Sequence, residues 1–212
     1  MSGTKPAGHL ADYLHRRLQY LERCNAEIET RLFDDQRDLL QKIDHGEFGP
    51  TDPVIGQTLF HLEYVLGNTL RYAMLVAVCS FLEEAMKAIT RHLVADYDSR
   101  IEGSKKRREN WLRTHIRILH EAISLDLTTI QSQLETFHDL ITLRNCVVHA
   151  WGKLAGTKNP GTVQAAVSRI ETVEVSRDGY LVFGDQVVPA AIIAAEEIAE
   201  SVLTSKLQTT MT

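Results

Sequence analysis

The segment LRNCVVHAWGKL, residues 143 to 154, places an arginine, an asparagine and a histidine among residues that otherwise match the apolar face of a helix. Strongly polar side chains are costly to bury without partners, so these three either lie on an exposed flank or are held there to act on something. In a helix, Arg144 and His149 lie about 140° apart around the axis and about 7.5 Å apart along it. Asn145 and His149 face each other, and an asparagine there can hydrogen-bond one imidazole nitrogen and fix its tautomer.

The six residues from Arg144 to His149, RNCVVH, lie in an apolar helix and are followed shortly by Gly152. This pattern resembles the signature of the HEPN superfamily, all-α domains that are often metal-independent ribonucleases. Asn145 matches the commonest family choice after the arginine. The layout is also similar, with long helices ahead of the motif and a patterned helix containing LVAVCSFLEEAMKAI.

The resemblance implies RNA cleavage by attack of the ribose 2′-OH on the adjacent phosphate, which leaves a 2′,3′-cyclic phosphate and needs no metal and no cofactor. Histidine suits the proton transfer, and the arginine fork suits the phosphate. His149 and Arg144 are therefore expected to be catalytic, with Asn145 orienting His149. In the family two motif helices meet across a dimer interface, so the resemblance implies a homodimer that binds RNA in a shared cleft.

The family also suggests a role as a toxin or an antiviral defence effector, restrained by an antitoxin or a regulatory protein. One alternative is a non-catalytic HEPN module that dimerises and binds nucleotides or protein partners. Another is an unrelated helical scaffold in which the match between Arg144 and His149 is accidental. Cleavage of RNA in EDTA, compared with a His149 variant, separates the first two.

Glu83, on the flank of its helix, is a supporting candidate, because its carboxylate could approach Arg144 across the bundle. The alternative is a half-exposed helix glutamate. Cys146 has apolar neighbours and is expected to be a small buried residue rather than a nucleophile.

The basic cluster Lys105, Lys106, Arg107 and Arg108 could steer RNA by a salt-dependent attraction, or could simply begin a solvated helix. Trp111 and Trp151 are expected to be packing residues. Trp151 could instead stack a base, because it follows His149 by two positions.

No pattern supports a metal site or another common enzyme class. The three cysteines are widely spaced, without a CxxC pair. His120-Glu121 matches half of a zinc-protease motif, but Ser124 stands where the second histidine would be. Serine-hydrolase, P-loop and dinucleotide-binding signatures are lacking.

The elements that would position the motif are long helices. We expect one helix over about 10–44, a second over about 57–96 with a possible interruption near Gly67-Asn68, a polar linker DYDSRIEGSKKRR, and a third helix from about Glu109. In the second helix an apolar stripe recurs at helical spacing, consisting of Leu75, Val78, Cys79, Leu82, Met86, Ile89 and Leu93. A fourth helix, capped by Asp126 or Thr128, carries the motif and ends at Gly152.

After the motif the sequence pattern changes from long helices to short elements. GKLAGTKNPGT is expected to be a loop and VQAAVSRI a short helical turn, while ETVEVSRDGYLVFGDQVVP matches a hairpin with an Asp-Gly turn. Pro189 is expected to open the last helix. The predicted fold is all-α, a single HEPN-like domain over 1–212, with a helical bundle over 10–155 and a hairpin-plus-helix extension over 160–212.

Composition sets the outer limits. With 212 residues, 44% of them hydrophobic, the chain suits one globular domain. No run approaches a membrane span, and the N-terminus lacks the apolar run of a secretory signal, so we expect a cytoplasmic protein without membrane contact. A net charge of -5 excludes binding of nucleic acid by bulk positive charge. Any RNA contact must come from local clusters.

Overall fold

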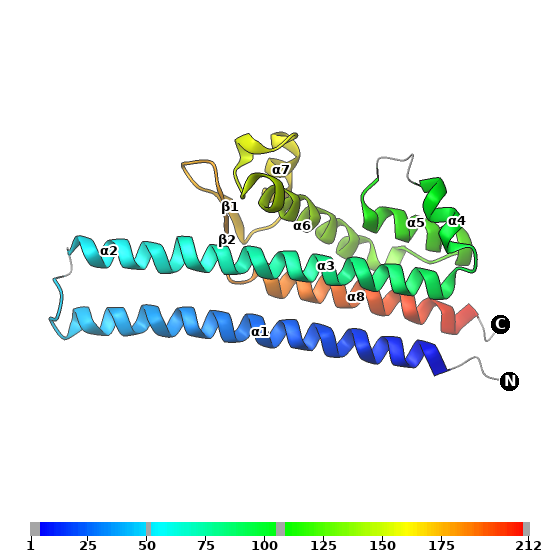
Figure 1. Cartoon of the computed structure of the whole chain (residues 1–212), viewed down its shortest axis with the longest axis horizontal. Helices are drawn as coiled ribbons and strands as arrows, with labels where there is room; N and C mark the ends of the chain where they lie inside the picture. Colours follow the sequence, from blue (N-terminus) through cyan, green and yellow to red (C-terminus); the bar gives the residue numbers. More distant parts are fainter. Residues whose placement is uncertain (1–4, 50–51, 105–108, 210–212) are drawn as a thin grey trace.

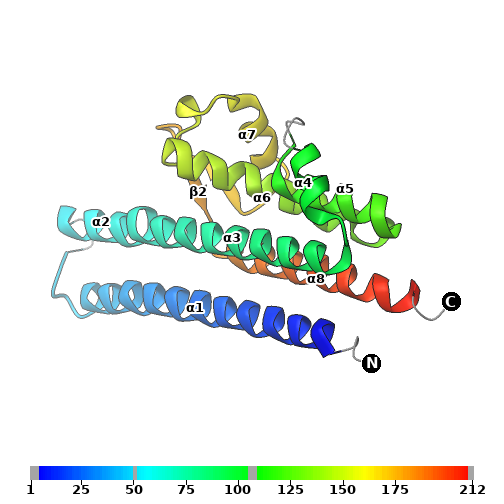
Figure 2. The same ribbon diagram turned by 45° about the vertical axis from the view of Figure 1, so that its right-hand side comes forward.

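The computed structural model describes residues 5–49, 52–104 and 109–209. Within these ranges, three long helical stretches form the body of the molecule: α1 (Lys5–Asp44), the continuous stretch Pro53–Leu93, and α8 (Val187–Thr209). α1 and α8 both pack on α3 (Asn68–Leu93), the last part of the middle stretch (Figures 1 and 2). α5 (Trp111–Ile123) and α6 (Gln131–Ala150) pack on α3 as well. The prediction of an all-α architecture with a small hairpin is confirmed.

The middle stretch forms the centre of the core. Of its predicted apolar stripe, Leu93 is partly buried, and the other six are fully buried: Leu75, Val78, Cys79, Leu82, Met86 and Ile89. They pack with Phe137, Leu140 and Leu143 of α6 and with Ile198 of α8 in one apolar cluster. The apolar stripe is continuous along α3 because the same face of this helix packs against both α6 and α8.

The middle helical stretch starts at Pro53, earlier than the predicted start near residue 57, and it continues through Gly67-Asn68 without an interruption. Asp52 caps α2 (Pro53–Phe60) by accepting a hydrogen bond from the Val54 N–H at 2.9 Å. The segment His61–Gly67 then continues as a π-helix into α3, so it changes register without a break.

By length and composition, Pro53–Leu93 is also apolar enough to cross a membrane. That is weak evidence, because the core helix of a soluble protein passes the same test. Only 33% of its most apolar 18-residue window is buried, which leaves part of the helix surface exposed.

The predicted linker after this helix is wrong in its first half, where Tyr97–Ser104 forms helix α4. Tyr97 is buried, and its hydroxyl lies 3.2 Å from Nε2 of His115 on α5. The Ser104 hydroxyl accepts a hydrogen bond from Arg117 at 2.8 Å. Tertiary contacts thus stabilise a polar helix that its composition alone does not predict. The basic cluster, residues 105–108, lies outside the described residues.

The β-hairpin is confirmed. β1 (Val173–Val175) pairs antiparallel with β2 (Leu181–Phe183), and Gly179 in the turn has a φ of +80°. Two helix starts differ from the prediction. α7 (Pro160–Val167) begins inside the predicted loop, and α8 begins at Val187, so Pro189 lies in its first turn, where a missing N–H removes no helix bond.

The end of α6 is confirmed near Gly152, but neither Asp126 nor Thr128 caps the helix, because α6 begins at Gln131 after Ile130, which makes no side-chain cap. The Asp126 carboxylate accepts hydrogen bonds from the N–H and hydroxyl of Thr128, which begins a short 3-10 turn ahead of the helix. At the other end Trp151 and Gly152 both have positive φ, 53° and 76°. The N–H groups of both donate to the Cys146 carbonyl, and the chain turns away from the helix there.

Candidate functional site

Asn145 and His149 of α6 open onto a common hollow of about 530 Å³. We call it the motif hollow; its lining includes Thr142, Asn145, Cys146 and His149 of α6, and Lys158, Asn159 and Thr162 from the following segment. Asn145 and His149 are exposed, as the exposed-flank alternative requires. No acidic residue is among the described residues that line the hollow. A chain of net charge -5 thus presents a neutral-to-cationic surface here.

Arg144 is not among the residues that line the motif hollow. Its Nη1 donates a hydrogen bond to Oδ1 of Asn145 at 3.1 Å. Its Nε is buried and has no hydrogen-bond partner within the described chain. The amide oxygen of Asn145 therefore serves Arg144 here, and no hydrogen bond joins Asn145 to the imidazole of His149 in the described residues. Of the three polar residues of the motif, Arg144 and Asn145 are therefore hydrogen-bonded to each other, and His149 lies one helical turn beyond Asn145.

Glu83 is half-buried on α3 and forms no ion pair with Arg144 among the residues that the structure describes. Both nevertheless lie near Cys79. Burial raises the pKa of the Cys79 thiol to about 12, with an opposing effect from the Arg144 charge and a further rise from Glu83. The charges of Arg144 and Glu83 thus both act on the same buried thiol of α3.

Cys146 is buried, as predicted, and burial raises the pKa of its thiol. A protonated, buried thiol is a poor nucleophile. Cys146 therefore anchors α6 and contributes only to the wall of the motif hollow.

The backbone just after α6 fits tightly against α3 and the hairpin. A Cβ on Gly152 would lie 2.3 Å from the Tyr72 hydroxyl oxygen. That hydroxyl donates to the Leu181 carbonyl at 2.5 Å, and the Leu181 N–H donates to the Gly152 carbonyl at 2.9 Å. β2 is held to α3 as well, because the Asn68 side chain bonds the Leu181 carbonyl and the Phe183 N–H. The hairpin, α3 and the end of the motif helix therefore position one another.

Trp151 does not pack, so that prediction is wrong. Its side chain is 85% exposed, and Val148 beside His149 is 43% exposed. A left-handed backbone conformation is uncommon and costly for a non-glycine residue, and this one directs a large aromatic side chain into solvent. Trp111 does pack, edge to face on Phe137 with ring centroids 6.4 Å apart.

Lys158, Asn159 and Thr162 were not predicted to be site residues. They were assigned to a loop, and only their approach to α6 through α7 makes them part of the hollow. One sequence feature could have indicated these residues: the segment KNPGT places a lysine next to polar side chains immediately before a helix.

One cluster in the described part of the chain has the composition of a metal site, and none of its residues lines the motif hollow. His15 of α1 and Glu196 and Glu200 of α8 offer ligand atoms within 4.8 Å of one another. His15 Nδ1 already lies 3.0 Å from Oε1 of Glu196, and its Nε2 2.8 Å from the Gln19 amide. These contacts join the first and last helices of the molecule.

No protein-family model, curated protein or solved structure matches this chain.

Proposed function

We propose that this protein has a HEPN-like fold and is a metal-independent endoribonuclease that acts as a homodimer. The observation that carries the proposal is the motif hollow itself. An imidazole and an amide open onto it beside the Arg144 guanidinium, Lys158 contributes to its lining, and none of the described lining residues carries a carboxylate. Proton transfer beside a polyanion requires a titratable group among donors and cations, which is the combination present there.

The reaction uses groups that two copies of the motif supply. The imidazole of one His149 takes the proton of the ribose 2′-OH, and the 2′ oxygen forms a bond to the adjacent phosphorus. The bond from phosphorus to the 5′ oxygen breaks, and the second His149 donates a proton to that oxygen. The products are a 2′,3′-cyclic phosphate and a 5′-OH. The guanidinium of Arg144 stabilises the added negative charge on the phosphorane.

Arg144 has unused capacity for this role. It makes one hydrogen bond, to Asn145, and its buried Nε has no partner in the described residues. A guanidinium has five N–H donors, so the terminal Nη groups that Asn145 does not occupy can bind a phosphate oxygen, whereas the buried Nε is not accessible to one.

The surface beside His149 supports the dimer. Val148 and Trp151 expose apolar side chains on either side of it. Exposed apolar residues next to functional groups mark interfaces, and tryptophan is among the residues that most often dominate binding energy there. Two motif helices meeting through this surface would place both imidazoles in one cleft.

The test is cleavage of single-stranded RNA by the full-length protein in EDTA. We expect cleavage that leaves 2′,3′-cyclic phosphate ends, and a loss of at least about 1,000-fold in His149→Ala. His92→Ala removes an exposed histidine at the end of α3 and serves as the matched control, with activity retained. Full activity in His149→Ala would falsify the proposal.

One observation favours a second candidate, a non-catalytic module that dimerises and binds a partner protein or nucleotide. Arg144 does not line the hollow with His149, and its charge instead acts on the buried thiol of Cys79. Under this alternative the protein is a dimer through Trp151, and RNA remains intact at every protein concentration. The cleavage assay combined with sedimentation of the same samples distinguishes the two.

By analogy with the family, we further propose a role as a cytoplasmic toxin or antiviral effector. A ribonuclease of that kind requires an antitoxin or regulatory partner. Co-expression with a neutralising partner would restore growth to cells that the active protein arrests, and the His149→Ala variant should not arrest them.

A further inference from the structure

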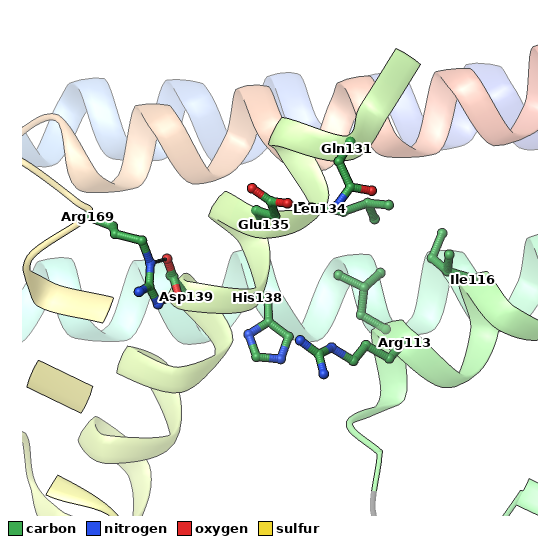
Figure 3. Close-up of a pocket in the computed structure, with 9 residues that line it drawn as sticks. Arg113, Ile116, Gln131, Leu134, Glu135, His138, Asp139 and Arg169 are labelled. Atoms are coloured by element: carbon green, nitrogen blue, oxygen red, sulfur yellow. Dashed lines mark hydrogen bonds and ion pairs between the residues drawn. The ribbon is translucent and has the colours of Figure 1, made fainter. Parts of the chain in front are cut away.

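A second hollow, of about 420 Å³, lies between α5 and the first half of α6 (Figure 3). We call it the arginine hollow, after Arg113 and Arg169, which line it. Its apolar lining comes from Leu112 and Ile116 of α5 and Leu134 of α6. Small-molecule sites typically combine this range of volume with an apolar lining and a few converging polar groups.

One wall of the arginine hollow is an ion pair between Arg169 and Asp139. Two hydrogen bonds of 2.6 Å join Nε and Nη2 of Arg169 to the two carboxylate oxygens of Asp139, whose side chain is only 9% exposed. The other carboxylate of the hollow, Glu135, accepts a hydrogen bond from the Gln131 amide at 2.7 Å. Both acidic side chains therefore already have donors.

Arg113 and His138 stand apart from this arrangement. Figure 3 shows their side chains pointing toward each other from α5 and α6. Among the described residues, neither the guanidinium nor the imidazole has a hydrogen-bond or ion-pair partner. Burial lowers the pKa of His138, and the charges of Arg113 and Arg169 lower it further, against the opposing effect of Asp139. A guanidinium and an imidazole without partners in the described residues thus face each other in a hollow whose two carboxylates are hydrogen-bonded to other groups.

We propose that the arginine hollow binds a small phosphate monoester that carries a ring. The phosphate would lie between Arg113 and His138, and the ring would lie on Leu112, Ile116 and Leu134. A phosphate offers several oxygens, so it can accept two parallel bonds from a guanidinium and another from an imidazole at the same time. Inorganic phosphate alone would leave the apolar lining exposed to water, whereas a ring would cover that lining and bury its apolar surface.

This site is distinct from the motif hollow and does not depend on the proposed ribonuclease activity. His138 and His149 are 11 residues apart on α6, which separates them by about 16 Å along the helix axis. The two histidines lie on nearly the same side of the helix, since three turns separate them. One helix therefore presents two separate anion-binding surfaces.

The proposal is tested by calorimetric titration of the full-length protein with phenyl phosphate. We expect saturable binding, at least about tenfold weaker for inorganic phosphate and for phenol, because each lacks one half of the interaction. Arg113→Gln and His138→Gln should each weaken phenyl phosphate by about tenfold or more. Arg113 is exposed on a helix surface, so its replacement leaves the core intact.

Arg177→Gln is the matched control, because it removes an exposed arginine of the hairpin turn and should leave binding unchanged. Three results overturn the proposal: no saturation with phenyl phosphate up to about 10 mM, equal binding by the Arg113→Gln variant, or benzoate binding as tightly as phenyl phosphate. The last would assign the hollow to aromatic carboxylates. The titration needs no RNA, so its outcome is independent of the cleavage assay.

Discussion

The two hollows along α6 differ in how their charged groups are partnered. No acidic residue is among the described lining of the motif hollow, and within the described residues the neighbouring Arg144 hydrogen-bonds only the Asn145 amide. The arginine hollow contains two carboxylates that are already hydrogen-bonded, beside Arg113 and His138, which have no partner in residues 5–49, 52–104 and 109–209. A surface without carboxylates accommodates a chain of phosphates, whereas a charge-balanced hollow with one unpartnered corner accommodates a single anionic group. The same helix thus supports two kinds of anion recognition.

Replacement of Arg144 tests the motif side of this comparison most strongly. We expect Arg144→Ala to reduce RNA cleavage by about 100- to 1,000-fold, because a donor to the developing charge is lost. The free energy of unfolding should change by less than about 1.5 kcal/mol, because the guanidinium makes one internal hydrogen bond.

Arg23→Ala, at an exposed position of α1, is the control for that experiment and should retain activity. If Arg144→Ala lowers stability strongly and cleavage only in proportion to the unfolded fraction, Arg144 is structural. Phenyl phosphate binding in the arginine hollow should be unaffected in either case.

Gly152→Ala should disturb the structure next to the motif hollow and leave the arginine hollow unchanged. The added methyl group would meet the Tyr72 hydroxyl at 2.3 Å, in a backbone with a φ of 76°. We expect a loss of about 2–4 kcal/mol in the free energy of unfolding, measured by urea denaturation. Gly161→Ala has no atom within 4 Å of the new Cβ, so it should change stability by less than about 1 kcal/mol. Equal effects of the two variants would contradict the tight fit at Gly152.

Trp151→Ser tests whether the exposed apolar surface at the motif is a dimer interface. We expect the dimer dissociation constant to rise by about 30-fold, as for an interface hot spot, with loss of cleavage at low protein concentration. Phe33→Ser removes another exposed aromatic side chain, on α1, and should leave the dimer intact. A protein that is monomeric before substitution, yet cleaves RNA, would rule out the shared site.

The smallest expected effect concerns the pH dependence of stability, to which the arginine hollow contributes through His138. Burial and the nearby Arg113 and Arg169 lower the pKa of His138 in the folded protein, while Asp139 opposes this. Glu135 also lines the hollow. A histidine in the unfolded chain has a pKa of about 6.5, so below that pH the unfolded chain binds more protons than the folded protein does. The stability contributed by neutral His138 should therefore be fully present above about pH 6.5. It should decrease as the pH falls below about 6.5, until the pH passes the lowered pKa of the folded protein.

His138→Gln should make this decrease shallower, as measured by thermal unfolding between about pH 7 and pH 5. His115 has a pKa lowered by burial in the same direction and will keep part of the slope. An identical slope in His138→Gln would show that the imidazole is not held neutral by the hollow.

The local parts of the fold were predictable because they depend on neighbours along the chain. The apolar stripe of α3, the end of α6 near Gly152 and the Asp-Gly turn each combine a spacing with a residue type, and each is where the pattern placed it. α4 was missed because its stability comes from contacts of Tyr97 and Ser104 with α5. Trp151 was expected to pack because size and hydrophobicity predict burial, but the turn after α6 directs it outward.

The sequence by itself determined that Arg144, Asn145 and His149 share one helix, since helix formation depends on local spacing and capping. Only the tertiary structure decided what surrounds them. It brought Lys158 beside His149, placed the charge of Arg144 near Cys79, and brought Arg113 and His138 into one hollow between two helices. Such juxtapositions arise from the packing of helices far apart along the chain, and no short-range pattern encodes them.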